Sequence, residues 1–346
     1  MSPWDHPDFD GHEVVHFATD EETGLRAIIA VHSSKLGPGA GGMRFRRYAD
    51  TGAALTDALR LSRAMSFKNA MAGLPFGGGK AVLIDDGMGK TPEKLATYGR
   101  ALEKLGGAYV TACDVGITVD DLVQVAKHSR HVSGLPADAG MAGGDSGKPT
   151  AYGVFLGIKA AVKRKLARES LSGLHIAIQG AGSVGGGVAR LAAGEGARIS
   201  IADVNEALAA SVAGEVGGQV ASPDEIVTLE ADVFSPCALG AILTEQSIPA
   251  LRTSIVAGGA NNQLAVPDDG NRLFARDILF APDYVINAGG IINVALGYLG
   301  NVTEAQMRAR VEEIPGRLEK IWDESAATGL NPAEVADIMA KRLIGR

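Results

Sequence analysis

A glycine-rich motif in the second half of the chain restricts its fold more than any other stretch. The residues Gly180, Ala181, Gly182, Ser183, Val184 and Gly185 fit the pattern GxGxxG. An apolar run at 174–179 predicts a strand before the motif, and 184–193 predicts a helix that the motif opens. In such a unit the glycines allow a tight turn, a close approach of the backbone to a pyrophosphate, and close packing of helix on sheet. The motif predicts a dinucleotide-binding α/β domain, and the alternative is an ordinary glycine turn before a helix.

An acidic residue after the next predicted strand indicates which dinucleotide binds. The strand at 197–202 is followed by Asp203 and Val204, and Asp203 lies 18 residues after Gly185. A carboxylate at this position accepts hydrogen bonds from a ribose 2′-OH and repels a 2′-phosphate. We therefore expect Asp203 and Val204 to bind the cofactor, and the cofactor to be NAD rather than NADP. The alternative for Asp203 is an exposed aspartate without a ligand.

Residues 133–149 differ in composition from their surroundings and divide the chain. They are rich in Gly, Pro, Asp and Ser and hold few large apolar side chains. A chain of 346 residues is long enough for two domains. We predict a first domain at 1–134, a hinge at 135–149, a dinucleotide-binding domain at 150–329 and a closing helix at about 330–346. The alternative is a long surface loop inside one domain.

Predicted strands alternate with predicted helices along most of the chain, which favours an α/β fold with a doubly wound parallel sheet. Before the hinge we expect strands at 25–32, 80–84 and 108–112, a glycine-rich turn at 37–42, and helices at Thr51–Met71, 92–105 and 118–128. After it we expect strands at 232–234, 254–257, 278–280 and 284–286, and helices at 152–166, 206–214, from 303 onward and at 332–344.

Composition excludes several classes of partner. The formal net charge is −7, and no run of Lys and Arg suggests binding to an anionic membrane, so nucleic acid and anionic membranes are not expected partners. No apolar stretch reaches 18 residues, and residues 1–10 do not resemble a signal peptide. The two cysteines, Cys113 and Cys237, imply no disulfide framework. We expect a cytosolic protein without a metal site.

Two polar residues in the first half stand in unusual places. Lys80 follows Gly77, Gly78 and Gly79 and precedes the apolar run AVLI. That flank would desolvate the amine and lower its pKa, and the glycines would let another molecule approach. Asp114 comes just after the predicted strand at 108–112, where α/β proteins place active-site groups. The alternatives are a strand-edge lysine that reaches solvent and an aspartate that caps a helix.

The chain resembles the glutamate/leucine/phenylalanine/valine dehydrogenase superfamily along nearly its whole length. Within that superfamily it resembles the leucine dehydrogenase branch most. The matching stretches are GPGAGGMRF (37–45), SFKNAMAGLPFGGGKAV (66–82), TACDVGITVDD (111–121), KPTAYGV (148–154), PCALGA (236–241), GGANNQL (258–264) and APDYVINAGGIINVA (281–295). The resemblance implies a homo-oligomer whose first domain binds substrate, carries out catalysis and forms the subunit interface. It also implies that the closing helix packs back on that domain.

The resemblance implies roles for individual residues. Lys68, with the backbone of Gly41 and Gly42, should hold the substrate carboxylate. Lys80 should activate water, and Asp114 should transfer protons. Asn261 should contact the substrate or the nicotinamide end of the cofactor, and Asn262 is the less favoured candidate for the same contact. The other residues implied to contact the cofactor are Thr150, Cys237, Ala238 and Asn287.

The substrate side chain is expected to be apolar. In the glutamate branch, a lysine and a serine bind the side-chain carboxylate at the positions of Ala40 and Val294 here. Burying an unpaired carboxylate there would cost several kcal/mol. The expected pocket consists of Ala40, Met65, Ala112, Ile291 and Val294. A branched aliphatic amino acid is the first choice. An aromatic amino acid is the second, because the small Ala40 leaves room for a larger side chain and because Met43 and Cys113 depart from the leucine enzymes.

The predicted reaction is the reversible, NAD-dependent oxidative deamination of that amino acid to its 2-oxo acid and ammonia. A different class of function on the same fold would be a catalytically inactive nucleotide-sensing protein. An NADP-linked glutamate dehydrogenase is disfavoured by Asp203, Ala40 and Val294.

Overall fold

The computed structural model describes residues 3–346, which form two compact units. The first unit comprises the chain up to Asp145 together with Asn293–Glu304 and Met339–Arg346. The second comprises Ser146–Ile292 and Ala305–Ile338. The segment Asn293–Glu304, which the sequence assigned to the dinucleotide-binding domain, is grouped here with the first unit.

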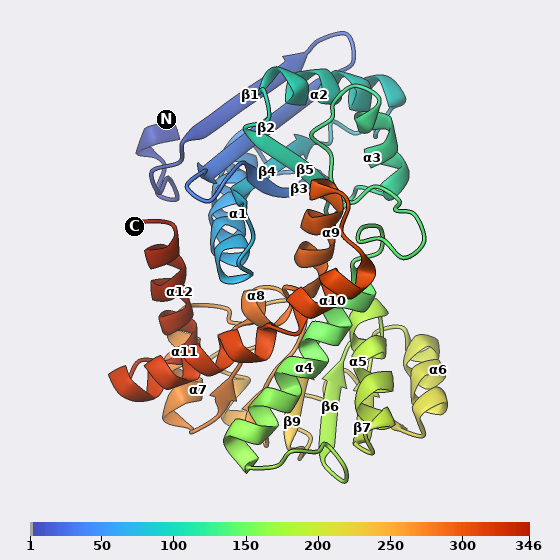
Figure 1. Cartoon of the computed structure of the whole chain (residues 1–346), viewed down its shortest axis with the longest axis vertical. Coiled ribbons are helices and arrows are strands. Elements are labelled where there is room, and N and C mark those ends of the chain that lie inside the picture. Colours follow the sequence, from blue (N-terminus) through green and yellow to red (C-terminus); the bar gives the residue numbers. More distant parts are fainter. Residues whose placement is uncertain (1–2) are drawn as a thin grey trace. The chain divides into compact units, whose positions relative to one another are not determined.

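A five-stranded mixed sheet forms the centre of the first unit (Figure 1). Its strands are β1 (Val14–Asp20), β2 (Leu25–Ser33), β3 (Gly39–Arg46), β4 (Gly77–Ile84) and β5 (Tyr109–Cys113). They lie in the order β1-β2-β4-β3-β5. The pairs β1–β2 and β2–β4 are antiparallel, whereas β3 is parallel to both β4 and β5. Because β3 lies between β4 and β5, the ends of these two strands lie on either side of it.

Helices cover both faces of this sheet. The helices are α1 (Thr51–Met71), α2 (Pro92–Lys104) and α3 (Val119–Ala126), preceded by a short 3-10 helix, η1 (Pro3–Asp5). Apolar residues of α1 pack with Val82 of β4, whereas α2 and α3 pack with Ala81 and Leu83, which point to the other face. Each helix starts where the sequence supplies a cap, since Asp50, Thr91 and Thr118 accept backbone hydrogen bonds.

The glycines of β3 lie in a strand, so the expectation of a turn at 37–42 was wrong from Gly39 onward. Likewise β4 begins at Gly77 rather than at Lys80. A Cβ on Gly78 would lie 2.1 Å from the backbone nitrogen of Ser66 in α1, and one on Gly79 would lie 2.4 Å from the ring of Tyr109. These glycines therefore allow close internal packing, which corrects the interpretation that they admit another molecule.

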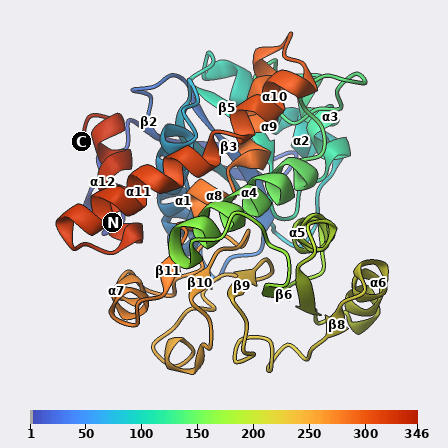
Figure 2. The same ribbon diagram turned by 60° about the horizontal axis from the view of Figure 1, so that its bottom comes forward.

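The second unit contains a six-stranded, wholly parallel sheet. Its strands are β6 (His175–Gln179), β7 (Arg198–Ala202), β8 (Gln219–Val220), β9 (Val233–Pro236), β10 (Ile255–Val256) and β11 (Leu279–Phe280). They lie in the order β11-β10-β9-β6-β7-β8. Figure 2 labels all of them except β7, and the labels follow this order from left to right. Numbered from β6, this is the order 3-2-1-4-5-6 of a dinucleotide-binding fold, so the predicted fold class is confirmed.

Helices and short connections complete the chain. They are α4 (Gly147–Leu166), α5 (Ser183–Gly194), α6 (Glu206–Val216), η2 (Ile248–Ala250), α7 (Asp268–Ala275), α8 (Asp283–Ile286), α9 (Gly289–Leu299), α10 (Glu304–Val311), α11 (Ile314–Thr328) and α12 (Pro332–Leu343). The strand expected at 284–286 is wrong, because this short apolar run forms α8 and Tyr284 donates a hydrogen bond to Asp337 at 2.9 Å. The helix expected from 303 onward is two helices, with Pro315 in the first turn of the second. None of the helices within residues 3–346 combines the length and apolar character needed to cross a membrane.

Candidate active site

Lys80 and Asp114 form a buried ion pair in the first unit. Alternation along β4 places Gly78, Lys80 and Val82 on the face that α1 covers. The side chain of Asp114, directly after β5, reaches this face, and its Oδ2 lies 2.6 Å from Lys80 Nζ. Lys80 is only 5% exposed. The two residues that the sequence singled out for acid–base chemistry thus lie in direct contact.

Burial and neighbouring charges set the protonation of this pair. Burial lowers the pKa of Lys80, and although the Asp114 carboxylate opposes this effect, the pKa stays below its ordinary value. Burial alone would raise the pKa of Asp114, but the positive charges of Lys80 and Arg44 hold it below its ordinary value. Asp114 is therefore a carboxylate at neutral pH, and Lys80 loses its proton more readily than a surface lysine.

Arg44 is a site residue that the sequence analysis missed. Its Nε donates a hydrogen bond to Asp114 Oδ2 at 2.8 Å, and its Nη1 donates to Asp57 Oδ2 at 2.9 Å. The hydroxyl of Tyr48 donates to the same Asp57 oxygen at 2.5 Å. The sequence did contain a signal, because Arg44 is a charged residue close to Gly41 and Gly42. Its position in the sequence does not show, however, to which face of the sheet its side chain points.

Gly41 and Gly42 lie beside the ion pair. The hydroxyl of Tyr109 donates to the carbonyl oxygens of Gly41, at 2.7 Å, and Gly42, at 3.1 Å. A Cβ on Gly42 would lie 2.7 Å from Cβ of Asp114, and one on Gly41 would lie 3.0 Å from Cγ of Met65. The lack of a side chain at Gly42 therefore makes room for Asp114, and the lack of one at Gly41 makes room for Met65.

The other residues predicted to bind substrate are spread over both units. Lys68 lies in the last turn of α1, and Ala40 and Ala112 are buried in the first unit. Val294 belongs to the first unit as well, and its carbonyl accepts a hydrogen bond from Ser133 at 2.8 Å. Asn261, Asn262 and Ile291 belong to the second unit.

The glycine loop between β6 and α5 has the form that a dinucleotide site needs. Gly180 has φ +102°, which favours glycine. A Cβ on Gly185 would lie 1.9 Å from the carbonyl oxygen of Gly180, so the third glycine is required for close packing. A Cβ on Gly182 would meet no atom of residues 3–346 within 4 Å, so its backbone faces open space at the start of α5. An anion can approach there.

Asp203 is tied to this loop. Its Oδ2 accepts a hydrogen bond from the backbone N–H of Ala181 at 2.7 Å, and its Oδ1 accepts one from Asn205 at 2.8 Å. The carboxylate thus stands at the tip of β7, half-buried, beside the loop. Each oxygen keeps a further lone pair that can accept a hydrogen bond from a ribose hydroxyl. Val204, next in the chain, is 90% exposed.

Further predicted cofactor residues gather in the second unit. Asn287 Nδ2 donates to Asn261 Oδ1 at 2.8 Å and to the Gly259 carbonyl at 3.1 Å. The thiol of Cys237 lies 3.4 Å from the Gly259 nitrogen. A Cβ on Gly180 would lie 3.0 Å from Cβ of Ala238, and a Cβ on Gly290 would lie 2.6 Å from Oγ1 of Thr150. Asn262 has φ +51°, a left-handed conformation, and its carbonyl accepts from Ala241.

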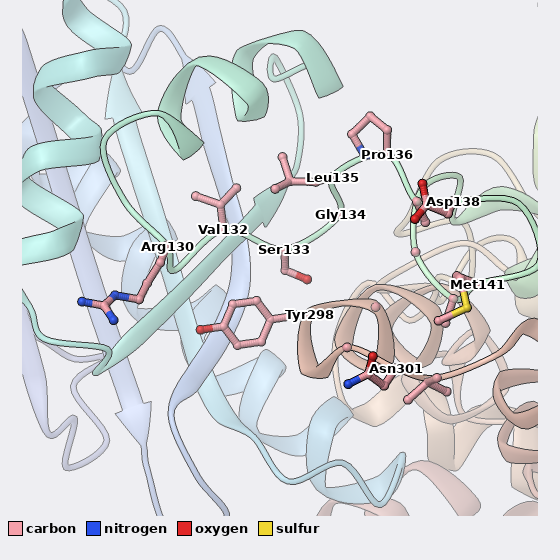
Figure 3. Close-up of a pocket in the computed structure, with 16 residues that line it drawn as sticks. Arg130, Val132, Ser133, Gly134, Leu135, Pro136, Asp138, Met141, Tyr298 and Asn301 are labelled. Atoms are coloured by element: carbon pink, nitrogen blue, oxygen red, sulfur yellow. The ribbon is translucent and has the colours of Figure 1, made fainter.

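A cavity of about 470 Å³ lies elsewhere in the first unit. Figure 3 shows Arg130 and Tyr298 toward one end of it, and Asp138, Met141 and Asn301 toward the other. None of the residues that line it is a site residue predicted from the sequence, although part of the lining belongs to the predicted hinge at 135–149. The Lys80–Asp114 pair, rather than this cavity, is therefore the candidate site.

Two family models match the chain. One is described as the dimerisation domain of Glu/Leu/Phe/Val dehydrogenases and matches residues 12–131. The other, described as Glutamate/Leucine/Phenylalanine/Valine dehydrogenase, matches residues 206–341. Together they cover more than half of the chain and confirm the resemblance that its motifs indicated.

Similar proteins agree with the family models. Leucine dehydrogenase from Geobacillus stearothermophilus is 41% identical over 96% of this chain and 90% of that protein. Phenylalanine dehydrogenase from Bacillus thermotolerans is 40% identical over 96% of this chain and 88% of that protein. The crystal structure of L-tryptophan dehydrogenase from Nostoc punctiforme is 39% identical, with a TM-score of 0.86 over 97% of this chain and 96% of that one.

Proposed function

We propose that this chain, which belongs to the Glu/Leu/Phe/Val dehydrogenase family and is therefore an amino acid dehydrogenase, oxidatively deaminates an apolar L-amino acid with NAD⁺. The overall reaction consumes the amino acid, water and NAD⁺, and it yields the 2-oxo acid, ammonium, NADH and a proton. The observation that carries the proposal is the buried contact of 2.6 Å between Lys80 and Asp114.

The glycine loop and its surroundings fit a nicotinamide dinucleotide. Gly182 and the start of α5 would hold the pyrophosphate, and Asp203 would hold the adenosine ribose. The hydrogen-bonded pair of Asn261 and Asn287, together with Thr150, would hold the nicotinamide end. Bound NAD⁺ supplies the acceptor for the hydride from Cα. We infer NAD rather than NADP because the Asp203 carboxylate would repel a 2′-phosphate.

The side chains of the first unit would carry the rest of the chemistry. The ammonium of Lys68 and the backbone at Gly41 and Gly42 would hold the substrate carboxylate, and such orientation lowers a barrier by several kcal/mol. Neutral Lys80 would take a proton from the water that attacks the iminium carbon. Asp114, whose two cationic contacts both use Oδ2, would pass protons as ammonia leaves. The pKa values of both groups lie below their ordinary values, which favours a neutral Lys80 and an ionised Asp114.

The substrate side chain is inferred from two positions. Ala40 and Val294 carry no charge that could pair with a second carboxylate, so a glutamate substrate is disfavoured. A branched aliphatic amino acid stays our first choice. An aromatic amino acid is the alternative, favoured by the small side chain of Ala40 and by the similarity to phenylalanine and tryptophan dehydrogenases. One methylene changes selectivity by only about 1–3 kcal/mol, so substrate identity needs a measurement.

A panel of amino acids assayed with NAD⁺ and with NADP⁺ tests this proposal. We expect NADH formation with leucine, valine and isoleucine, weaker turnover with NADP⁺, and none with glutamate. Highest kcat/KM with phenylalanine or tryptophan would replace the aliphatic assignment by the aromatic one. Turnover of no amino acid would favour a nucleotide-sensing protein, and highest kcat/KM with glutamate would refute the apolar pocket.

Assembly and location are also proposals. We propose that the chain forms a homo-oligomer through its first unit, which is supported by the match of residues 12–131 to a dimerisation domain. The cytosolic location stays a prediction from the two isolated cysteines.

A further inference from the structure

Arg44 connects the Lys80–Asp114 pair to a second carboxylate. One planar guanidinium contacts both acids through different nitrogens, Nε at 2.8 Å from Asp114 and Nη1 at 2.9 Å from Asp57. Asp57 is itself bound by Tyr48 at 2.5 Å. The chain of contacts therefore runs from Tyr48 through Asp57, Arg44 and Asp114 to Lys80.

We propose that Arg44 is a positioning residue for the reaction: anchored by Asp57 and Tyr48, it fixes the carboxylate of Asp114 against the amine of Lys80. This inference rests on the proposed roles of Lys80 and Asp114. It adds to them a cause for the orientation of Asp114, which follows the last residue of β5 and is not held by strand pairing of its own.

The geometry explains why an arginine is needed at this position. Asp114 Oδ2 receives both Lys80 and Arg44, so the two cations together determine where this oxygen lies. A planar fork of donors spans two carboxylates in a fixed arrangement, whereas a lysine ammonium would contact them as a point charge. The side chain of Arg44 is only 17% exposed, so solvent weakens these contacts little.

Asp57 links Arg44 to helix α1. Asp57 lies in the helix that packs on β4, and Tyr48 lies in the connection between β3 and that helix. Removal of Asp57 would leave the charge of Arg44 in place but free its side chain to turn. Removal of Arg44 would leave Asp114 with Lys80 as its one cationic contact among residues 3–346.

The charges of Arg44 and Asp57 act on Lys80 in opposite directions. Arg44 contributes to lowering the pKa of Lys80, and Asp57 contributes to raising it. If Lys80 must be neutral, kcat/KM rises with pH through the pKa of Lys80. Loss of Arg44 should then move this acidic limb to higher pH, and loss of Asp57 should move it to lower pH.

The test compares Arg44→Gln and Asp57→Asn in the full-length enzyme, with the best amino acid of the substrate panel. We expect kcat to fall about 10- to 100-fold in both variants, with KM changed much less, because misplaced groups slow the chemical step. The acidic limb should move in opposite directions. Arg44→Lys should restore the position of the limb, since it keeps the charge, but not the full kcat.

Arg60→Gln is the matched control. Arg60 lies on α1, pairs with Asp8 at 2.7 Å and is 67% exposed, so its loss should leave kcat and the pH profile unchanged. NADH titration gives the fraction of intact enzyme for each variant. A wild-type kcat and profile in Arg44→Gln would overturn the inference, as would equal shifts of the limb in both variants.

Variants of Lys80 and Asp114, measured in parallel, distinguish a failure of the inference about Arg44 from a failure of the proposals on which it rests. If Lys80→Ala and Asp114→Ala lose turnover while Arg44→Gln and Asp57→Asn keep it, the inference fails and the proposed function stands. If Lys80→Ala keeps turnover, the proposed catalytic role of Lys80 fails as well, whereas the proposed function itself fails only if the wild-type enzyme turns over no amino acid. Should Arg44→Gln not fold, Asp57→Asn decides, because wild-type kcat in that variant contradicts an anchored Arg44.

Discussion

At the scale of single residues, two buried lysines of the first unit offer a direct comparison. Lys80 pairs with Asp114, whereas Lys94 of α2, only 2% exposed, lies 3.0 Å from Asp86 and 3.2 Å from the Gly89 carbonyl. Lys80→Ala should lose at least 10²-fold in kcat because the base is removed, while NADH binding is kept since the glycine loop lies in the other unit. Lys94→Ala should lower the free energy of unfolding but keep kcat. Steady-state kinetics and NADH titration of both variants measure this, and near-wild-type kcat in Lys80→Ala would remove our catalytic assignment.

The same comparison indicates what sequence can and cannot predict about side chains. Lys80 and Asp114 could be singled out because each interrupts or ends an apolar strand within a recognisable motif. Arg44 could not, because an arginine near the end of a strand usually points into solvent, and only the position of α1 shows that Asp57 meets it. Lys94, equally buried, gave no signal, since its aspartate lies in a loop eight residues earlier.

At the scale of elements, the contact between α1 and β4 depends on Gly78. A Cβ there would lie 2.1 Å from the backbone nitrogen of Ser66 and 2.2 Å from its Oγ, so helix and strand would have to separate. Gly78→Ala should therefore lower the free energy of unfolding by about 1–3 kcal/mol or more, as overpacked cores do. Gly214→Ala is the control, because a Cβ there meets no atom of residues 3–346 within 4 Å and α6 should gain about 0.5–1 kcal/mol. Urea unfolding curves measure both, and a loss in both variants alike would contradict the packing argument.

Elements were predictable where local chemistry decides them. The bounds of α1 agree with the sequence because Asp50 caps a long run with apolar residues near helical spacing, and β6 and α5 follow from the glycine loop between them. The glycines of β3 were expected to form a turn, because glycine is common in turns, and those of β4 were left outside the expected strand at 80–84, but both sets pair as strands in the sheet. Periodicity cannot tell a short buried strand from a short buried helix, and the run at 284–286 forms α8, with Val285 and Ile286 buried.

At the scale of the whole molecule, stability should depend on pH through His32. This residue of β2 is completely buried, and its Nδ1 lies 2.8 Å from Ser66 Oγ. A guanidinium nitrogen of Arg346 lies 2.7 Å from Nε2. Because a guanidinium only donates, Nε2 must accept and the ring proton must lie on Nδ1, so the neutral ring fits this place. Asp10, 3.4 Å from Nε2, favours the charged ring, but burial and Arg346 outweigh it and lower the pKa of His32 to about 4.

The sign of the pH dependence follows from that pKa. The unfolded chain takes up a proton on this histidine below pH about 6.5, whereas the folded protein does so only below about 4. The stability contributed by neutral His32 is therefore complete above pH 6.5, falls as the pH is lowered from 6.5 to 4, and changes no further below that. At about 1.4 kcal/mol per pKa unit, the loss is about 3 kcal/mol. Urea unfolding between pH 7 and 4 measures it, and His32→Gln, although less stable at pH 7, should show a flatter profile. An unchanged slope in that variant would mean that other groups, such as His12, whose pKa is also lowered by burial, carry the acid sensitivity.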